Sequence, residues 1–137
     1  MISYGKQFID QSDIDAVVDV MRGDWLTQGP KVQEFENDLK HYFGTKYVCA
    51  VSNGTAALHL AGIALGWTEN DIIITSPITF LATANSIEYS GAKTVFVDID
   101  KDNYTIDLNQ VESKIKECYS KGQNVKAVIG IDFAGHP

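Results

Sequence analysis

The sequence predicts an α/β protein: a mostly parallel sheet covered by helices on both faces, which makes three layers. Short apolar runs such as Ile72–Thr75 and Thr94–Val97 alternate with segments of helical periodicity such as Thr79–Ile87. The apolar runs carry few polar side chains, which is typical of strands buried on both faces of a parallel sheet. Parallel strands are joined by right-handed crossovers, so helices are expected on both faces.

The composition is that of a soluble globular protein. The 137 residues, 45% of them hydrophobic, are enough for one domain with a packed core. The net charge of −7 argues against a general surface for nucleic acids or anionic membranes. No apolar run suits a membrane span or a leader peptide, so a cytoplasmic location is the default. Cys49 and Cys118 are expected to be reduced, and no Cys/His spacing predicts a metal site.

Residues 1–45 are predicted to form a helical arm. Its first helix starts at the capping pair Gln11-Ser12 and ends near Arg22, with apolar side chains at helical spacing. The loop 24–30 follows, and it is either a plain helix–helix connector or a substrate loop. Pro30 opens a second helix, which ends near Phe43.

Residues 46–137 are predicted to form the α/β portion. The apolar run Tyr47–Val51 is expected to be a buried strand, and the helix after it ends at Gly66. The remaining expected elements are a strand at 72–75, a helix that opens with residues 79–87 and ends by Gly91, a strand at 94–97, a helix at 108–121 capped by Asp107, and a strand at 125–131.

The turn Ser52-Asn53-Gly54-Thr55 is the strongest candidate for a binding site. It lies at the start of a predicted helix, where free backbone N–H groups point outward. Gly54 lets the backbone approach a ligand, Ser52 and Thr55 add hydroxyl donors, and either Ser52 or Asn53 can cap the helix. These donors suit a phosphate dianion, although similar junctions occur in α/β proteins that bind nothing there.

Three loops are expected to meet at one edge of the sheet. Ser52–Thr55, Ser76–Phe80 and Asp132–Pro137 each follow a predicted strand. Ligands of open α/β sheets bind at the carboxyl ends of the strands, so we expect these loops to share a site.

Four segments with distinctive sequences occur in order along the chain: 25–30 (WLTQGP), 52–58 (SNGTAAL), 76–85 (SPITFLATAN) and 132–137 (DFAGHP). Together they resemble the DegT/DnrJ/EryC1/StrS family of pyridoxal-phosphate-dependent sugar aminotransferases. Within it they are most similar to the branch that aminates UDP-linked 4-keto-6-deoxy-N-acetyl sugars on the way to pseudaminic acid. The resemblance covers essentially the whole chain and implies the N-terminal part of the large domain of a fold-type I transferase.

The resemblance implies roles for residues at the matching positions. Gly54 and Thr55 would hold the phosphate of pyridoxal 5'-phosphate, Asn53 would shape the turn, and Phe80 would stack on the pyridine ring. The residues that would line the sugar-nucleotide entrance are Tyr4, Thr27, Gln28 and Gly29. Those that would border the pocket are Asp132, Gly135 and His136.

The resemblance also implies that the Schiff-base lysine of the family lies beyond Pro137. We therefore expect a single partial domain with no catalytic residue of its own and no turnover by these residues alone. The full-length protein would be a homodimer that transfers the amino group of glutamate to a nucleotide-linked 4-keto-6-deoxy sugar. Two alternatives stay open: a sugar dehydratase of the same fold, with a histidine in place of the lysine, and a non-catalytic α/β module that binds another anion.

Overall fold

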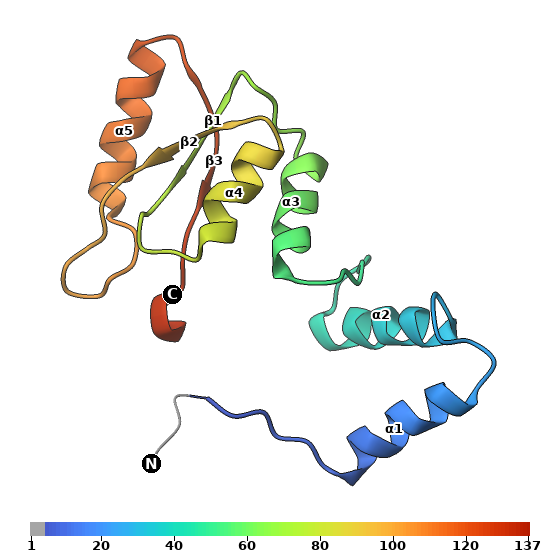
Figure 1. Cartoon of the computed structure of the whole chain (residues 1–137). Helices are drawn as coiled ribbons and strands as arrows, with labels where there is room; N and C mark the ends of the chain where they lie inside the picture. Colours follow the sequence, from blue (N-terminus) through green and yellow to red (C-terminus); the bar gives the residue numbers. More distant parts are fainter. Residues whose placement is uncertain (1–4) are drawn as a thin grey trace. The chain divides into compact units, whose positions relative to one another are not determined.

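The computed structural model describes residues 5–137, and the chain divides into two compact units, Met1–Ala50 and Val51–Pro137. The first unit contains the helices α1 (Gln11–Arg22) and α2 (Pro30–Phe43) (Figure 1). Pro30 occupies the first turn of α2, where its missing N–H costs nothing. Gly44 ends α2 with a φ of 63°, a left-handed conformation that glycine adopts without strain.

The cap of α1 differs from the predicted pair Gln11-Ser12. Asp10 is the cap, and its carboxylate accepts hydrogen bonds from the backbone N–H groups of Ser12 and Asp13 at 2.8 and 3.2 Å. The Asp13 carboxylate in turn accepts from the Asp10 N–H, which completes a capping box. Ser12 lies inside the first turn of α1, and its hydroxyl donates to the Asp10 carboxylate at 2.6 Å.

The second unit alternates helices and strands (Figure 1). The three strands are parallel and lie in the order β2-β1-β3, so the predicted parallel sheet is confirmed. Both strand-to-strand connections pass through a helix, as parallel pairing requires. The elements in chain order are α3 (Gly54–Ala64), β1 (Asp71–Thr75), α4 (Leu81–Tyr89), β2 (Lys93–Phe96), α5 (Leu108–Ser120), β3 (Asn124–Ile129) and the short 3-10 helix η1 (Phe133–Gly135).

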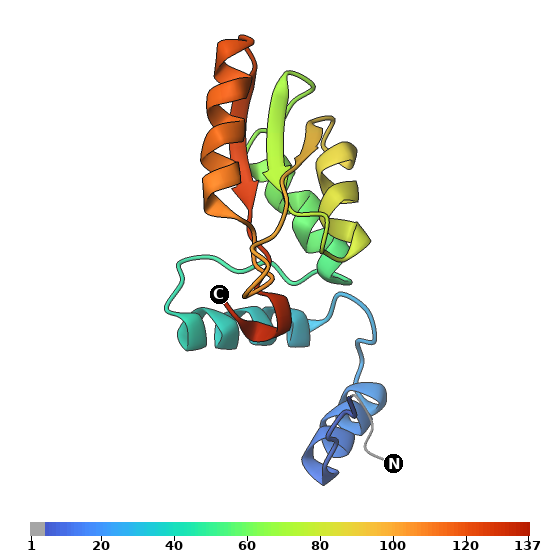
Figure 2. The ribbon, with the colours of Figure 1, turned by 90° about the vertical axis from the view of Figure 1, so that its left-hand side faces the viewer.

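The sheet of this unit lies between two layers of helix, which confirms the predicted three-layer arrangement. Figure 2 shows α5 on one face and α3 with α4 on the other. Successive side chains of β1 point to opposite faces. Ile72 and Ile74 therefore pack in the cluster under α5 that contains Cys118, whereas Ile73 packs with Trp67 and Ile87 on the opposite face. The paired clusters are the core of the unit.

The predicted buried strand at Tyr47–Val51 is wrong. Residues 46–51 have no regular secondary structure, and the side chain of Tyr47 is exposed. An extended segment becomes a strand only when a neighbouring strand takes up its N–H and C=O groups. The part of the chain that the structure describes provides no such neighbour, and the N–H of Ala50 donates instead to Glu36 Oε1 at 2.9 Å.

The close approach of α3 to Trp67 depends on Gly62. A Cβ built at Gly62 would lie 2.5 Å from Ser90 Oγ and 2.5 Å from the buried ring of Trp67. We predict that Gly62→Ala lowers the free energy of unfolding by about 1–3 kcal/mol through overpacking. Most of this range exceeds the roughly 1 kcal/mol that alanine gains over glycine in a helix, so the net effect is destabilising.

Urea unfolding measures the effect of Gly62→Ala. Gly130→Ala is the matched control, because a Cβ at Gly130 would meet no atom within 4 Å. A Gly62→Ala variant as stable as the parent would contradict the packing described for α3.

The stability of the second unit should also depend on acid through Glu117. The Glu117 carboxylate accepts from Lys114 Nζ at 2.6 Å and from Lys121 Nζ at 2.5 Å, and these bonds lower its pKa from 4.5 to about 2. The folded state thus resists protonation more than the unfolded state, so this contribution is present above about pH 4.5 and is lost as the pH falls toward about 2.

We expect Glu117→Gln to lose less stability than the parent over this pH range. The difference should be small, because the pair is partly exposed, and it should shrink in high salt, which screens surface charges. Urea unfolding across the pH range tests this expectation, and equal pH profiles for the two proteins would refute it.

Candidate functional site

The turn before α3 presents two unused backbone donors. Asn53 is the cap of this helix, with its Oδ1 accepting from the N–H of Ala56 at 2.9 Å and its carbonyl accepting from the N–H of Ala57 at 3.2 Å. Among the described residues, the N–H groups of Gly54 and Thr55 have no acceptor. Of the two caps that the sequence allowed, the structure selects Asn53 and leaves these donors at the positive end of α3.

The space over the turn is open. A Cβ built at Gly54 would meet no atom within 4 Å, and Asn53 and Gly54 are both exposed. The φ of Gly54 is outside the left-handed region, so the glycine is not needed for the shape of the backbone. Its value is that no side chain covers the free N–H groups. An anion can therefore reach both donors without a rearrangement of the turn.

Phe80 lies at the start of the neighbouring helix, α4. Its side chain is 79% exposed, so it belongs to neither apolar cluster of the core. It is the cap residue of α4, with an extended backbone that ends the loop 76–80. Within that loop, Ser76 Oγ donates to the Ile78 carbonyl at 3.2 Å, and Thr79 Oγ1 at its end donates to Thr83 Oγ1 of α4 at 2.8 Å. The loop is thus held by its own hydroxyls while the aromatic ring faces solvent.

The fold of the second unit brings these groups to one edge. The helices α3 and α4 run opposite to the strands, so both helices begin where the strands end (Figures 1 and 2). The hydroxyl of Thr75 donates to the carbonyl of Ile129 at 3.0 Å and ties the ends of β1 and β3 together there. The segment 132–137 leaves β3 at the same edge. All three loops predicted to share an edge therefore do so, although no strand precedes the first of them.

The predicted entrance residues lie in the first unit. Thr27 and Gln28 are exposed, and Gln28 has a φ of 50°, which is unusual for a residue with a side chain. A Cβ at Gly29 would lie 2.7 Å from Cβ of Trp25, so the glycine makes room for this tryptophan. The role of Thr27, Gln28 and Gly29 at a substrate entrance stays a prediction. Tyr4, assigned to the same entrance, lies outside the described residues.

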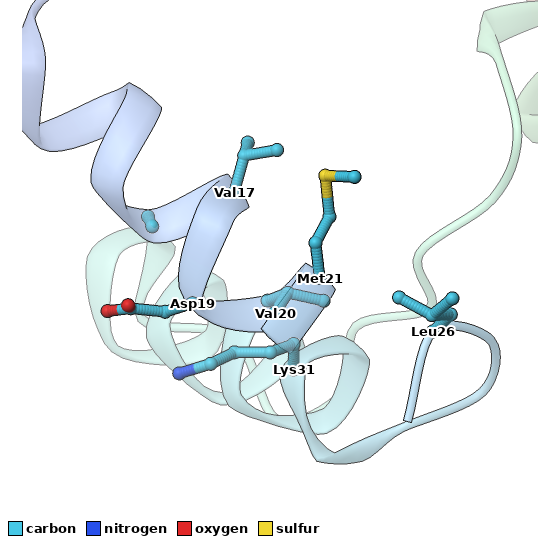
Figure 3. Close-up of a pocket in the computed structure, with 7 residues that line it drawn as sticks. Val17, Asp19, Val20, Met21, Leu26 and Lys31 are labelled. Carbon is cyan, nitrogen blue, oxygen red and sulfur yellow. The ribbon is translucent and has the colours of Figure 1, made fainter. Parts of the chain in front are cut away.

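The first unit also contains an apolar pocket of about 570 Å³ that the sequence motifs did not indicate. Figure 3 shows Val17 and Met21 on α1, with Leu26 contributed by the loop that follows. The helical spacing of the apolar residues on α1 is the signal that could have found it. Its lining consists of Ala16, Val17, Asp19, Val20, Met21, Leu26 and Lys31.

The described part of the chain has neither a metal-binding cluster nor a membrane-spanning helix. Residues 5–137 contain no cluster of three or more His, Cys, Asp or Glu side chains arranged to hold a metal ion. None of the helices in this range has the length and apolar character needed to cross a membrane. Cys49 is exposed and Cys118 is buried, and both are free thiols in this structure.

The comparisons with known proteins agree with the geometry. The model of the DegT/DnrJ/EryC1/StrS aminotransferase family matches residues 7–137, and the chain belongs to this family. The prediction from the four motifs is thus confirmed.

Two relatives show the range of the family. The chain is 43% identical to the UDP-4-amino-4,6-dideoxy-N-acetyl-beta-L-altrosamine transaminase of Campylobacter jejuni, over 99% of this chain and 35% of that protein. It is 39% identical to the UDP-4-amino-4-deoxy-L-arabinose–oxoglutarate aminotransferase of Shewanella sediminis, over 93% and 31% of the two chains. The chain thus spans about a third of the length of the curated relatives it matches.

Solved structures match over similar lengths. Helicobacter pylori PseC, an aminotransferase involved in the biosynthesis of pseudoaminic acid, is 32% identical with a TM-score of 0.83, over 98% of this chain and 35% of that one. A sugar aminotransferase of Streptococcus pneumoniae in its PLP form is 31% identical with a TM-score of 0.86, over 99% and 33%. The fold predicted from the resemblance is therefore confirmed.

The cap of α3 provides a direct test of this turn. We predict that Asn53→Ala lowers the free energy of unfolding by about 1 kcal/mol, because the N–H of Ala56 loses its acceptor. Asn53→Ser should retain most of the stability, since a serine hydroxyl can accept the same bond. Urea unfolding of the three proteins measures the difference, and equal losses for both variants would show that Asn53 does not act as the cap.

Proposed function

We propose that this chain forms the phosphate- and ring-binding part of a pyridoxal-phosphate-dependent sugar aminotransferase. The observation that carries the proposal is the pair of free N–H groups of Gly54 and Thr55 at the start of α3, on the same sheet edge as the exposed ring of Phe80. The family match and the PLP form of a neighbouring structure support the choice of cofactor.

The residues present fit the cofactor. A phosphate needs several donors and no bulk, and the turn offers two N–H groups, the hydroxyls of Ser52 and Thr55, and no Cβ at Gly54. No charged side chain belongs to the turn, so the positive end of α3 and its amide hydrogens would supply the attraction. A flat ring suits the exposed face of Phe80.

In the proposed reaction, the residues of this chain bind and orient the cofactor and the substrate. Gly54 and Thr55 would hold the phosphate end of the cofactor, and Phe80 would pack on its ring and so help to orient it. Pyridoxal phosphate supplies an electron sink when bound. Thr27, Gln28 and Gly29 line the entrance for the nucleotide sugar, and Asp132, Gly135 and His136 border the pocket. The proton-transferring lysine lies outside these residues in this proposal.

The whole protein would transfer the amino group of glutamate to the C4 ketone of a nucleotide-linked 6-deoxy sugar. The names of the relatives from Campylobacter jejuni and Shewanella sediminis support a nucleotide-sugar substrate. The proposal includes a homodimer and a cytoplasmic location. It keeps the division into a helical arm, residues 1–45, and a cofactor-binding portion, residues 46–137.

The cofactor assignment is tested by binding to the intact polypeptide in which this sequence occurs. Pyridoxal 5'-phosphate should bind much more tightly than pyridoxal, which lacks the phosphate. Phe80→Ala should weaken the binding of the phosphorylated form by about tenfold, the cost of one lost aromatic contact. Tyr89→Ala is the matched control, because Tyr89 is an exposed aromatic residue at the opposite end of the same helix. Equal affinities for the two ligands would refute the phosphate site.

Turnover provides an independent test. The intact polypeptide should form 2-oxoglutarate from glutamate in the presence of a nucleotide-linked 4-keto sugar, and the 137 residues alone should form none, because they contain no assigned catalytic group. Release of water from the sugar without amination would instead favour the dehydratase. Formation of 2-oxoglutarate by the 137 residues alone would contradict the proposed division of labour.

A further inference from the structure

We propose that Tyr104 is a positioning residue that, through its contact with Phe133, holds the segment Asp132–Pro137 at the edge of the sheet. The rings of Tyr104 and Phe133 lie with their centroids 5.9 Å apart and their planes at 46°. Tyr104 belongs to the loop between β2 and α5, whereas Phe133 begins η1 after β3. The inference rests on the proposed function in one respect, which is that this edge of the sheet is the binding site.

The backbone of the first loop fixes Tyr104. Its φ of 64° is in the left-handed region, which is costly for a residue with a large side chain. Three bonds support this conformation: the N–H of Tyr104 donates to the Asp100 carbonyl at 2.8 Å, the N–H of Asp100 donates to the Thr105 carbonyl at 2.8 Å, and the N–H of Thr105 donates to Asn103 Oδ1 at 2.9 Å.

The ends of this loop are also joined. Ile99 and Ile106 form an antiparallel bridge, and the N–H of Asp107 donates to the Asp98 carbonyl at 3.0 Å. Ile106 is buried in the cluster under α5, so the base of the loop is attached to the core. A strained residue persists where its surroundings determine its conformation, and this loop meets that condition. Tyr104 is therefore a rigid support.

The second segment has less to hold it. η1 is a single turn of three residues without a buried side chain, and Ala134 and Gly135 have φ values of 53° and 82°. Its own bonds are local: the N–H of Gly135 donates to the Asp132 carbonyl and the N–H of His136 to the Phe133 carbonyl, both at 3.0 Å. A short exposed turn with only local bonds opens readily unless another part of the chain packs on it.

The ring of Phe133 supplies that packing. Its side chain remains 41% exposed and that of Tyr104 53% exposed, and the two rings lie against each other where the loop of Tyr104 runs beside η1 (Figure 2). Asp132 and His136 flank the anchored turn. If Phe133 were released, both flanking residues would lose their fixed place at the edge where α3 and α4 begin. Tyr104 thus acts on the site through Phe133 and not by direct contact.

Hydrogen exchange of the Gly135 and His136 amides tests the inference in the intact polypeptide without cofactor. Tyr104→Asn should accelerate their exchange by about two- to tenfold, the range for one aromatic pair. Asparagine tolerates the left-handed backbone, so this variant removes the ring and keeps the loop. Tyr104→Phe retains the ring and should exchange like the parent. The Asp100 amide, bonded within the first loop, reports whether that loop stays intact.

If Tyr104 only stabilised the fold in general, the residues with faster amide exchange in Tyr104→Asn would be different ones. General loosening would accelerate amides throughout the second unit, whereas the inference confines the change to residues 133–136. Unchanged exchange of Gly135 and His136 in Tyr104→Asn would overturn it, as would equal acceleration across the sheet. If the Asp100 amide also loses its protection in Tyr104→Asn, the variant Phe133→Leu decides between the two explanations. Phe133→Leu should accelerate the exchange of Gly135 and His136 in the parent but not in the Tyr104→Asn background. Additive effects of the two changes on exchange would overturn the inference.

A second measurement connects the pair to the site. In the intact enzyme, Tyr104→Asn should raise the KM for the nucleotide sugar about two- to tenfold and leave the affinity for pyridoxal 5'-phosphate unchanged, with Tyr104→Phe restoring the parent value. An unchanged KM alongside faster exchange would overturn the positioning role. The exchange experiment uses no cofactor or substrate, so a failure of the proposed function would be recognised separately from a failure of this inference.

Discussion

The burial of β1 is the constraint on which the second unit depends. Every residue of Asp71–Thr75 is buried, and Ile73 and Ile74 are completely removed from water on opposite faces of the sheet. Burying an isoleucine side chain contributes about 1.5–3 kcal/mol, so both faces of this strand must be covered. The helix α5 covers one face, and α3 with α4 covers the other. Parallel pairing then places β2 and β3 on either side of β1.

The candidate site follows from the same constraint. A helix that connects parallel strands runs back against them, as α4 does, and α3 lies beside α4 in the same direction, so both helices begin at the edge where the strands end. The free N–H groups of Gly54 and Thr55 face this region, and in the proposed function they attract the phosphate without a charged side chain. The same orientation of α3 and α4 covers β1 in the core and directs the backbone N–H donors of α3 toward the candidate site. Residues 53–55 and Phe80 thus require little structure of their own beyond a cap and an open approach.

Much of the fold could be predicted because its signals are local. Pro30 starts α2 through its fixed φ, Gly44 ends it through a left-handed backbone, and Asp107 caps α5 by accepting bonds two and three residues on. All three effects are local, so their meaning is visible in the sequence. The cap of α1 was assigned to the wrong residues for a related reason. Ser12 is a good cap in general, but the Asp10 carboxylate two positions earlier accepts from the N–H groups of Ser12 and Asp13, so the helix begins before Ser12.

The sequence by itself determined the family, the order of helices and strands in the second unit, and the turn at residues 52–55, because periodicity, caps and short motifs depend on neighbours along the chain. Only the tertiary structure decided which apolar runs become strands. Tyr47–Val51 has the composition of a strand but meets no partner strand among residues 5–137, whereas Ile72–Thr75 has one on each side. It also decided that Phe80 faces solvent and that Tyr104 meets Phe133, since both outcomes depend on residues distant in sequence that the fold brings together.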